Sequence, residues 1–256
     1  MSDWGKGVNN NIGWGQGADN DIGWGSIYDK SNAGETLLKS DLNIDAFIIE
    51  VDTSKAGTPS NQFQFTGAEG DYDVVAKQND IVVATFNDLS GAETITLPSS
   101  GVYNLEVIPK SSNGFNRIEF DNDGDRKKVI NLKQWGSVAW SDFRFRGCFN
   151  MYYNATDSPN LTQVSGLTVA FYNCINANID ARNWDVSGIS GLSAAFNNTG
   201  MSKENLTAIY ENWSQLTLQQ NVDVDFGDTQ YFEAGQAGKD ILVNTYNWTI
   251  TDGGQV

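Results

Sequence analysis

Three aspartates at alternate positions could provide oxygen ligands for a metal ion. Asp121, Asp123 and Asp125 lie in the segment DNDGD, and this spacing is typical of the first half of a calcium-binding loop. Such a loop also needs a bidentate glutamate a few positions later, whereas the next three residues are RKK. The sequence therefore leaves a Ca²⁺ site open at these aspartates but favours a turn that joins two domains.

The residues that common enzyme mechanisms require are largely missing. The chain has no histidine, which excludes Ser-His-Asp and Cys-His catalysis and His-ligated zinc. It also has no P-loop, nucleophile elbow or dinucleotide-binding fingerprint. A carboxylate pair, as in a polysaccharide depolymerase, remains the alternative, because the 32 acidic residues supply many pairs. We expect a protein that is not an enzyme and has no cofactor apart from the Ca²⁺ considered above.

Three aromatic residues could bind a glycan or protein ligand. Trp140 interrupts the repeat described below, and Tyr152 and Tyr153 lie in the polar segment NMYYNATDSPN. Aromatic side chains offer flat apolar faces, and neighbouring amides can bind hydroxyl groups. The alternative, which the sequence favours, is that the tyrosines cover the edge of the repeats and Trp140 fills the junction between two domains.

The charge and hydropathy of the chain exclude two kinds of partner. A formal net charge of −16 argues against a nucleic-acid surface, because phosphate contacts need clustered Lys and Arg. No apolar run approaches the roughly 18 residues of a membrane-spanning helix. We expect neither nucleic-acid binding nor membrane insertion.

The chain begins with decapeptides that each start with Trp-Gly. Trp4, Trp14 and Trp24 are ten residues apart, and Ile12 and Ile22 repeat with them. Ten is an even number, so an extended chain would place the tryptophans on one face, while the many glycines weaken any regular element. We expect residues 1–40 to be an extended peptide that docks on a partner through these five side chains. A flexible tail, or a strap over the chain's own domain, is the alternative.

The elements expected in residues 41–126 are short strands. Runs of alternating apolar and polar residues are separated by Gly, Asn, Asp, Ser and Pro, which predicts a small antiparallel β-sandwich. The runs are 46–53, 62–67, 71–78, 80–86, 93–98, 102–109 and 116–120. The segment LPSSGVYNLEVIP resembles the last hairpin of a PKD-type immunoglobulin-like domain.

Residues 127–256 contain a repeat. VSGLTVAFYNC (164–174) and ISGLSAAFNNT (189–199) match at a shift of 25, and a looser copy ending at Cys148 precedes them. This period predicts a short leucine-rich-repeat-like solenoid, in which Phe171 would lie above Phe196 and Leu167 above Leu192. Cys148 and Cys174 would then occupy equivalent interior positions, where cysteine packs as a small apolar residue.

The sequence near the end of the chain predicts a few helices and strands. GMSKENLTAIYENWSQL is typical of a helix capped by Ser202, with an apolar face that includes Leu206 and Trp213. The segment from residue 221 onward predicts a strand, a short helix and a strand that close the stack. The expected fold class is thus mainly β with a few helices.

Two resemblances bear on function. NLTQVSGLTVAFYNC and NWDVSGISGLSAAFNNT resemble the BspA-like leucine-rich surface repeats, whose usual lead Trp-Asp-Val-Ser is present at residues 184–187. The Trp-Gly decapeptides are similar to the N-termini of structural proteins from phages that infect Bacteroidetes, including crAss-like phages. These resemblances imply an adhesion, interaction or virion protein.

Together these features predict a phage structural protein, a head or tail fibre or decoration component. The first residues lack the basic and apolar segments of a secretory signal, so we expect assembly in the host cytoplasm and exposure outside the cell on the virion. Its expected partners are other virion proteins, further copies of itself and a host-surface glycan or protein. A bacterial surface or secreted adhesin is the alternative, and a depolymerase is the second alternative.

Overall fold

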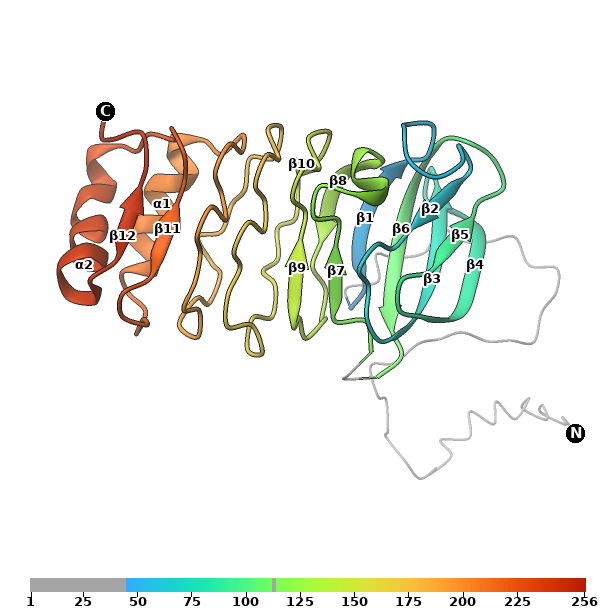
Figure 1. Ribbon diagram of the computed structural model, residues 1–256, viewed down its shortest axis with the longest axis horizontal. Helices are drawn as coiled ribbons and strands as arrows, with labels where there is room; N and C mark the ends of the chain where they lie inside the picture. Colours follow the sequence, from blue (N-terminus) through green and yellow to red (C-terminus); the bar gives the residue numbers. More distant parts are fainter. Residues whose placement is uncertain (1–44, 112–113) are drawn as a thin grey trace, which may run out of the picture. The chain divides into compact units, whose positions relative to one another are not determined.

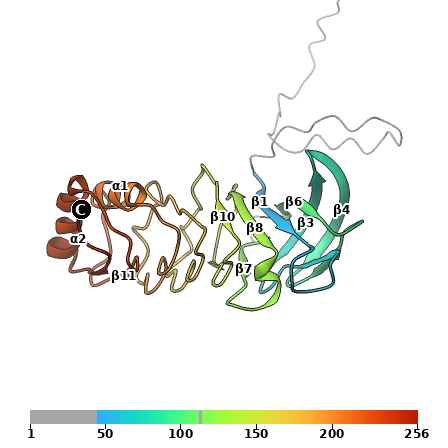
Figure 2. The ribbon, with the colours of Figure 1, turned by 90° about the horizontal axis from the view of Figure 1, so that it is seen from above.

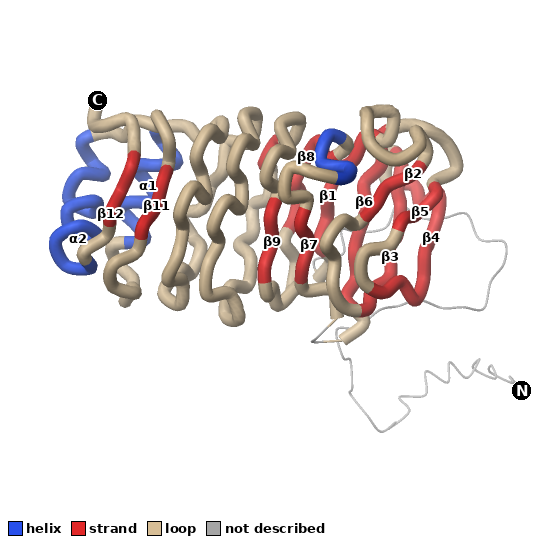
Figure 3. Tube along the Cα trace, in the orientation of Figure 1, coloured by secondary structure: helices blue, strands red, loops and turns tan. Residues whose placement is uncertain are grey.

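The computed structural model describes residues 45–111 and 114–256. The expected docking peptide, with Trp4, Trp14, Trp24, Ile12 and Ile22, lies outside these residues. Within the described part, which all belongs to one compact unit, the structure is mainly β with two α-helices (Figures 1 and 3). The expected fold class is confirmed at this level.

The largest sheet has six strands in the order β10-β8-β1-β6-β3-β4. All neighbours are antiparallel except β10 and β8. In chain order the strands are β1 (Phe47–Asp52), β3 (Asp71–Gln78), β4 (Ile81–Ser90), β6 (Val102–Pro109), β8 (Val129–Gln134) and β10 (Tyr152–Tyr153). Because β8 pairs with β1, the sheet crosses the domain boundary expected at residues 126 and 127.

Alternation along these strands separates a core face from the opposite face. In β1 the side chains of Phe47, Ile49 and Val51 belong to the buried core, as the period of two requires. A second sheet, β2 (Gln62–Gln64) with β5 (Thr94–Thr96), adds Phe63 and Ile95 to the same core. The six-stranded sheet and this two-stranded sheet therefore share one apolar interior.

All seven strands predicted between residues 46 and 120 are present, but the seventh does not pair with an antiparallel strand of the expected sandwich. This strand, β7 (Arg117–Glu119), pairs in parallel with β9 (Asp142–Arg144). It is followed by a 3-10 turn at Gly124–Lys127 and then by β8. The parallel pairing of successive segments thus begins at β7, before residue 127, where the sequence predicts the repeats to begin.

A row of phenylalanines runs through the stacked segments. The rings of Phe145, Phe171, Phe196 and Phe226 follow one another with centroids 5.6, 6.2 and 5.4 Å apart and planes tilted by 10 to 12°. Phe120 lies next to Phe145 at the start of the row, with a centroid distance of 6.0 Å. The predicted contact of Phe171 with Phe196 is confirmed.

The backbone at this row forms a matching ladder of hydrogen bonds. Each phenylalanine N–H donates to the carbonyl oxygen that precedes its partner in the next segment. The acceptors for Phe120, Phe145, Phe171, Phe196 and Phe226 are Arg144, Ala170, Ala195, Asp225 and Thr251, at 2.6 to 3.2 Å. The parallel pairing of β11 (Asp223–Asp225) with β12 (Thr249–Thr251) continues the ladder to the end of the chain.

The row ends at a polar residue. By the register of β11 and β12, the partner of Phe226 is Asp252. The Asp252 carboxylate accepts hydrogen bonds from the Tyr210 hydroxyl at 2.5 Å and from Lys239 Nζ at 2.7 Å. A carboxylate held in this way occupies the place where another repeat would put an aromatic ring.

Two helices lie beside the last segments (Figure 2). Helix α1 (Lys203–Trp213) is capped by Ser202, whose side chain accepts a hydrogen bond from the Asn205 N–H, as the sequence predicts. Helix α2 (Gln236–Tyr246) follows a 3-10 turn at Glu233–Gly235 and lies between β11 and β12 in the chain, so the predicted strand, helix and strand are confirmed.

Candidate functional site

The structure separates the three aromatic residues proposed as a ligand site. Trp140 is completely buried, and its ring contacts Phe47 edge-on with a centroid distance of 5.0 Å. Tyr153 is also buried, and its hydroxyl accepts a hydrogen bond from Trp135 Nε1 at 3.0 Å. Tyr152 alone of the three is on the surface, with 58% of its area exposed. The interpretation of Trp140 and Tyr153 as ligand-binding residues is therefore wrong, because core packing covers both rings.

The aspartates proposed as calcium ligands are used within the fold. Asp125 is buried and accepts hydrogen bonds from Thr58 N–H and Oγ1 and from Gln64 N–H, at 2.7, 2.7 and 2.8 Å. Lys128 Nζ lies 3.7 Å from its carboxylate, and burial lowers the pKa of this lysine. In the part of the chain that the structure describes, no group of three or more His, Cys, Asp or Glu side chains is arranged to hold a metal ion.

Asp121 and Asp123 do not join Asp125 in a ligand set. Asp121 forms an ion pair with Arg146 at 3.1 Å, and the Asp123 N–H donates to the Phe120 carbonyl. The segment DNDGD is a turn that leads into a 3-10 helix and β8, and the buried Asp125 connects this turn to the segment before β2. The segment DNDGD thus forms a turn, which is the alternative that the sequence favoured.

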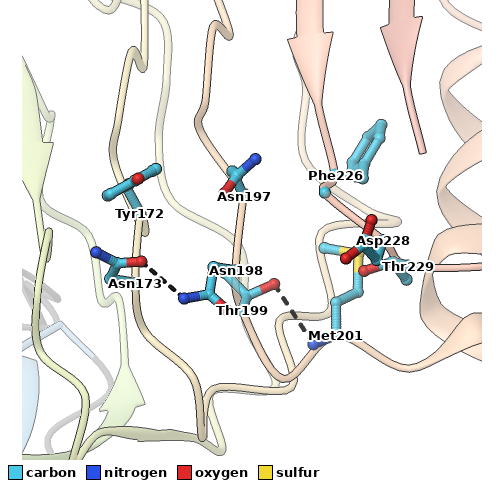
Figure 4. A pocket seen from close by; sticks show the side chains of 10 residues that line it. Tyr172, Asn173, Asn197, Asn198, Thr199, Met201, Phe226, Asp228 and Thr229 are labelled. Carbon is cyan, nitrogen blue, oxygen red and sulfur yellow. Dashed lines mark hydrogen bonds between the residues drawn. The ribbon is translucent and has the colours of Figure 1, made fainter. Parts of the chain in front are cut away.

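A polar cleft of about 490 Å³ lies on the outer side of the last repeats. It is formed by three neighbouring segments of the stack and is called here the polar cleft. Its lining residues are Tyr172, Asn173, residues 197–199, Met201 and residues 226–229. Figure 4 shows Tyr172 and Asn173 on one side, Asp228 and Thr229 on the other, and Asn197 and Asn198 between them.

The backbone turns that form the polar cleft require particular residue types. Two residues after Phe171 and Phe196 stand Asn173 and Asn198, with φ angles of 62 and 54°. This left-handed conformation is unfavourable for most side chains but is tolerated by Asn and Gly. Gly227, with φ of 60°, makes the corresponding turn directly after Phe226. These turns therefore put the short polar side chains of Asn173 and Asn198 at the same corner of two neighbouring segments, whereas Gly227 makes the turn of the third segment without a side chain.

Hydrogen bonds fix the amides of the polar cleft. Asn198 Nδ2 donates to Asn173 Oδ1 at 2.8 Å, across one step of the stack. Asn197 Nδ2 donates to Asp225 Oδ2 at 2.8 Å, and the other oxygen of Asp225 accepts from the Gly227 N–H at 2.7 Å. An amide has two donor hydrogens and an acceptor oxygen, so one such bond leaves hydrogen-bonding capacity for a ligand.

The polar cleft also has apolar surfaces. Met201 and Phe226 line it, although both are mostly buried in the core. The Arg146 guanidinium lies over the half-buried Tyr172 ring, 5.6 Å from the ring centroid, in a cation-π contact. Apolar groups with amides, three hydroxyls and one exposed carboxylate around them form a surface that suits binding more than proton transfer.

The sequence contains a weak signal for the polar cleft, although this cleft is not among the predicted sites. Both aligned repeats end in Asn-rich segments, FYNC and FNNT, and the third contribution is FGDT. The first two are 25 residues apart, but the third is displaced by the inserted helix α1. The three segments become neighbours only through the ladder of hydrogen bonds.

Comparison with protein-family models, with curated proteins and with solved structures found no match to this chain. A search of the described residues for a helix long and apolar enough to cross a membrane found none.

Proposed function

We propose that this chain is a non-enzymatic structural protein of a phage particle. Its N-terminal peptide anchors it to other virion proteins, and its β-rich part projects from the head or tail to recognise the host surface. The assignment to a phage particle is supported by the Trp-Gly decapeptides in the sequence. The assignment to a projecting, recognising part is supported by the stacked repeats and their polar cleft.

The finer description of the fold belongs to the same proposal. The six-stranded sheet with β2 and β5 is interpreted as a small immunoglobulin-like or PKD-like β-sandwich, and the segments from β7 onward as a short solenoid of the leucine-rich-repeat type. The two are not divided at residues 126 and 127, because β8 pairs with β1 and β7 with β9. The single observation that supports the solenoid is the phenylalanine row with its hydrogen-bond ladder, because the steps join equivalent positions 25 or 26 residues apart, or 30 where α1 is inserted. A stack of this kind presents a firm surface whose side chains repeat along one direction.

The chemistry of the stack favours binding over catalysis. The residues that repeat most regularly, the phenylalanines and the buried Cys148 and Cys174, serve packing. The residues at the surface of the polar cleft are mainly neutral amides and hydroxyls, which bind hydroxyl or carbonyl groups but do not exchange protons near neutral pH.

Removal of the N-terminal peptide tests the proposed anchoring. A variant lacking residues 1–30 should fold with the same melting temperature as the full chain but should be missing from purified phage particles. A matched variant carrying Trp4→Ala, Trp14→Ala and Trp24→Ala should lose incorporation as well, because buried tryptophans at an interface contribute about 2 kcal/mol or more each. Normal incorporation of the truncated protein would contradict the proposed anchoring.

The location of the protein and its activity on polysaccharide separate the alternatives. A bacterial surface or secreted adhesin is favoured by the resemblance of residues 184–187 to the lead of BspA-like repeats, and it would be found in the cell-surface or secreted fraction of bacteria instead of in particles. A depolymerase would release reducing sugar from host polysaccharide.

A further inference from the structure

We infer that the polar cleft is a saccharide-binding site that takes a short segment of a neutral polysaccharide. This inference names the ligand class of the host recognition proposed above and rests on that proposal. It replaces the aromatic site expected at Trp140, Tyr152 and Tyr153, of which two residues are buried.

The size of the polar cleft fits a small ligand. Its volume of about 490 Å³ lies within the roughly 300–1,000 Å³ of typical small-molecule sites. It is open to solvent along the outer side of the stack, with walls from three successive segments. A saccharide segment can therefore reach the lining residues directly from solvent.

The chemistry of the lining matches a sugar ring. A pyranose has apolar C–H faces and a rim of hydroxyl groups that both donate and accept hydrogen bonds. The apolar surfaces come from Tyr172 and Met201, and the amides of Asn173 and Asn198 offer donors and acceptors to the rim. Asp228 adds a carboxylate, which forms stronger hydrogen bonds with hydroxyl donors than a neutral acceptor does.

The amides are held in place before a ligand arrives. The bond between Asn198 and Asn173 and the bonds of Asp225 with Asn197 and Gly227 restrict side chains that would otherwise rotate freely. Binding therefore costs less conformational entropy than at a set of mobile surface amides. The same bonds give each amide a defined direction, which is needed to distinguish one sugar stereochemistry from another.

The charge around the polar cleft selects against anionic sugars. Asp228 lines one side, and the Asp225 carboxylate behind it accepts a hydrogen bond from the lining Asn197. Arg146, which lies against Tyr172, is paired with Asp121, and the whole chain has a net charge of −16. Like charges repel uronic acids, sialic acids and sulfated sugars, so the preferred ligand is an uncharged hexose or N-acetylhexosamine chain. A single shallow site of this kind binds weakly, with a dissociation constant of about a millimolar, and many copies on one particle would raise the avidity.

The test measures binding of defined oligosaccharides to the full chain. Hexasaccharides of glucose, mannose and N-acetylglucosamine serve as neutral probes, and a heparin hexasaccharide serves as the anionic control. Saturation-transfer NMR detects millimolar binding. We expect at least one neutral probe to bind and the heparin probe not to bind.

Four variants locate the site. Asn198→Gly and Asp228→Asn should each weaken binding about tenfold, since a hydrogen bond in such a site contributes about this factor. Glycine removes the amide of residue 198 but keeps its left-handed backbone. Asn247→Gly and Asp240→Asn make the same chemical changes on exposed residues away from the polar cleft, Asn247 also having a left-handed backbone, and should leave binding unchanged. Thermal unfolding of all four should match the parent chain, which separates loss of ligand contacts from loss of folding.

Two results would overturn the inference: no binding of any neutral probe, or binding that persists in both cleft variants. Failure here is distinct from failure of the proposed virion role. The cleft variants should enter particles normally if the virion proposal is right, whereas absence of the parent chain from particles would contradict that proposal whatever the sugar measurements show.

Discussion

Cys148 and Cys174 occupy equivalent places in neighbouring repeats. Each stands three residues after a phenylalanine and donates its N–H to that phenylalanine's carbonyl oxygen. Both thiols are free and buried, and the Cys174 thiol donates to the Phe145 carbonyl at 3.0 Å. Burial raises the pKa of both, that of Cys174 from 9.0 to about 12.

These thiols should make the protein sensitive to alkaline pH. The folded state keeps Cys174 protonated, so its contribution to stability is complete below pH 9 and is lost as the pH rises from 9 to about 12. Urea unfolding between pH 7 and 11 should show a falling free energy of unfolding, by at most about 1.4 kcal/mol per pH unit for this group. Cys174→Ala should reduce that slope and leave the part that belongs to Cys148, and an equal slope in the variant would contradict the assignment.

Burial should also protect both thiols from reagents. In the native protein, iodoacetamide should leave them unmodified at neutral pH until denaturant is added.

Single residues were the hardest features to predict from the sequence. The interior positions of the cysteines follow from the repeat, and both are confirmed as buried. For the aromatic candidates the sequence left two interpretations open, because an interruption of the repeat does not reveal whether a side chain points outward. The interpretation that it favoured for Trp140, packing at a junction, agrees with the burial of that ring. Trp140 interrupts the pattern and yet lies inside, where the first repeats meet the sheet around Phe47. The polar cleft was missed because its walls come from separate segments.

At the scale of elements, the phenylalanine row should carry much of the stability of the stack. Phe171 is buried between Phe145 and Phe196, and its ring contacts both. Phe171→Ala should lower the free energy of unfolding by about 3–5 kcal/mol, because it leaves a cavity with neighbours on two sides.

An exposed phenylalanine provides the control. Phe232 has 37% of its surface exposed, and Phe232→Ala should cost less than about 1 kcal/mol. Chemical denaturation of the two variants measures both values. Equal destabilisation would mean that the row contributes no more than a surface aromatic residue does.

Most elements could be predicted from local sequence patterns. The strands between residues 46 and 120 and the helix capped by Ser202 follow from alternation and capping, which are local properties. The pairing of β7 with β9 could not be predicted in this way, because only tertiary structure shows which neighbour a short strand has. Phe226 was not recognised as part of the row, since α1 lengthens its repeat from 25 to 30 residues.

At the scale of the whole described unit, one apolar core extends from Phe47 to Trp248. Strand β8, which comes after the expected boundary, is hydrogen bonded to β1 before it, and Trp135 contacts rings on both sides. We therefore expect one cooperative unfolding transition instead of two. Calorimetry should give a ratio of calorimetric to van't Hoff enthalpy near one, and variants at opposite ends, such as Val51→Ala and Phe226→Ala, should lower the same transition. Two separate transitions would instead support independent domains at residues 41–126 and 127–256.

The aspartate at the end of the phenylalanine row, Asp252, affects how copies of the chain associate at high local concentration. A stack of repeats tends to polymerise without limit, because the unpaired backbone groups and apolar face of its last segment can bind a neighbouring molecule. At Asp252 a second molecule would have to bury a carboxylate already bound by Tyr210 and Lys239, which is energetically costly. Many copies of the chain can therefore be packed close together without joining end to end into fibres.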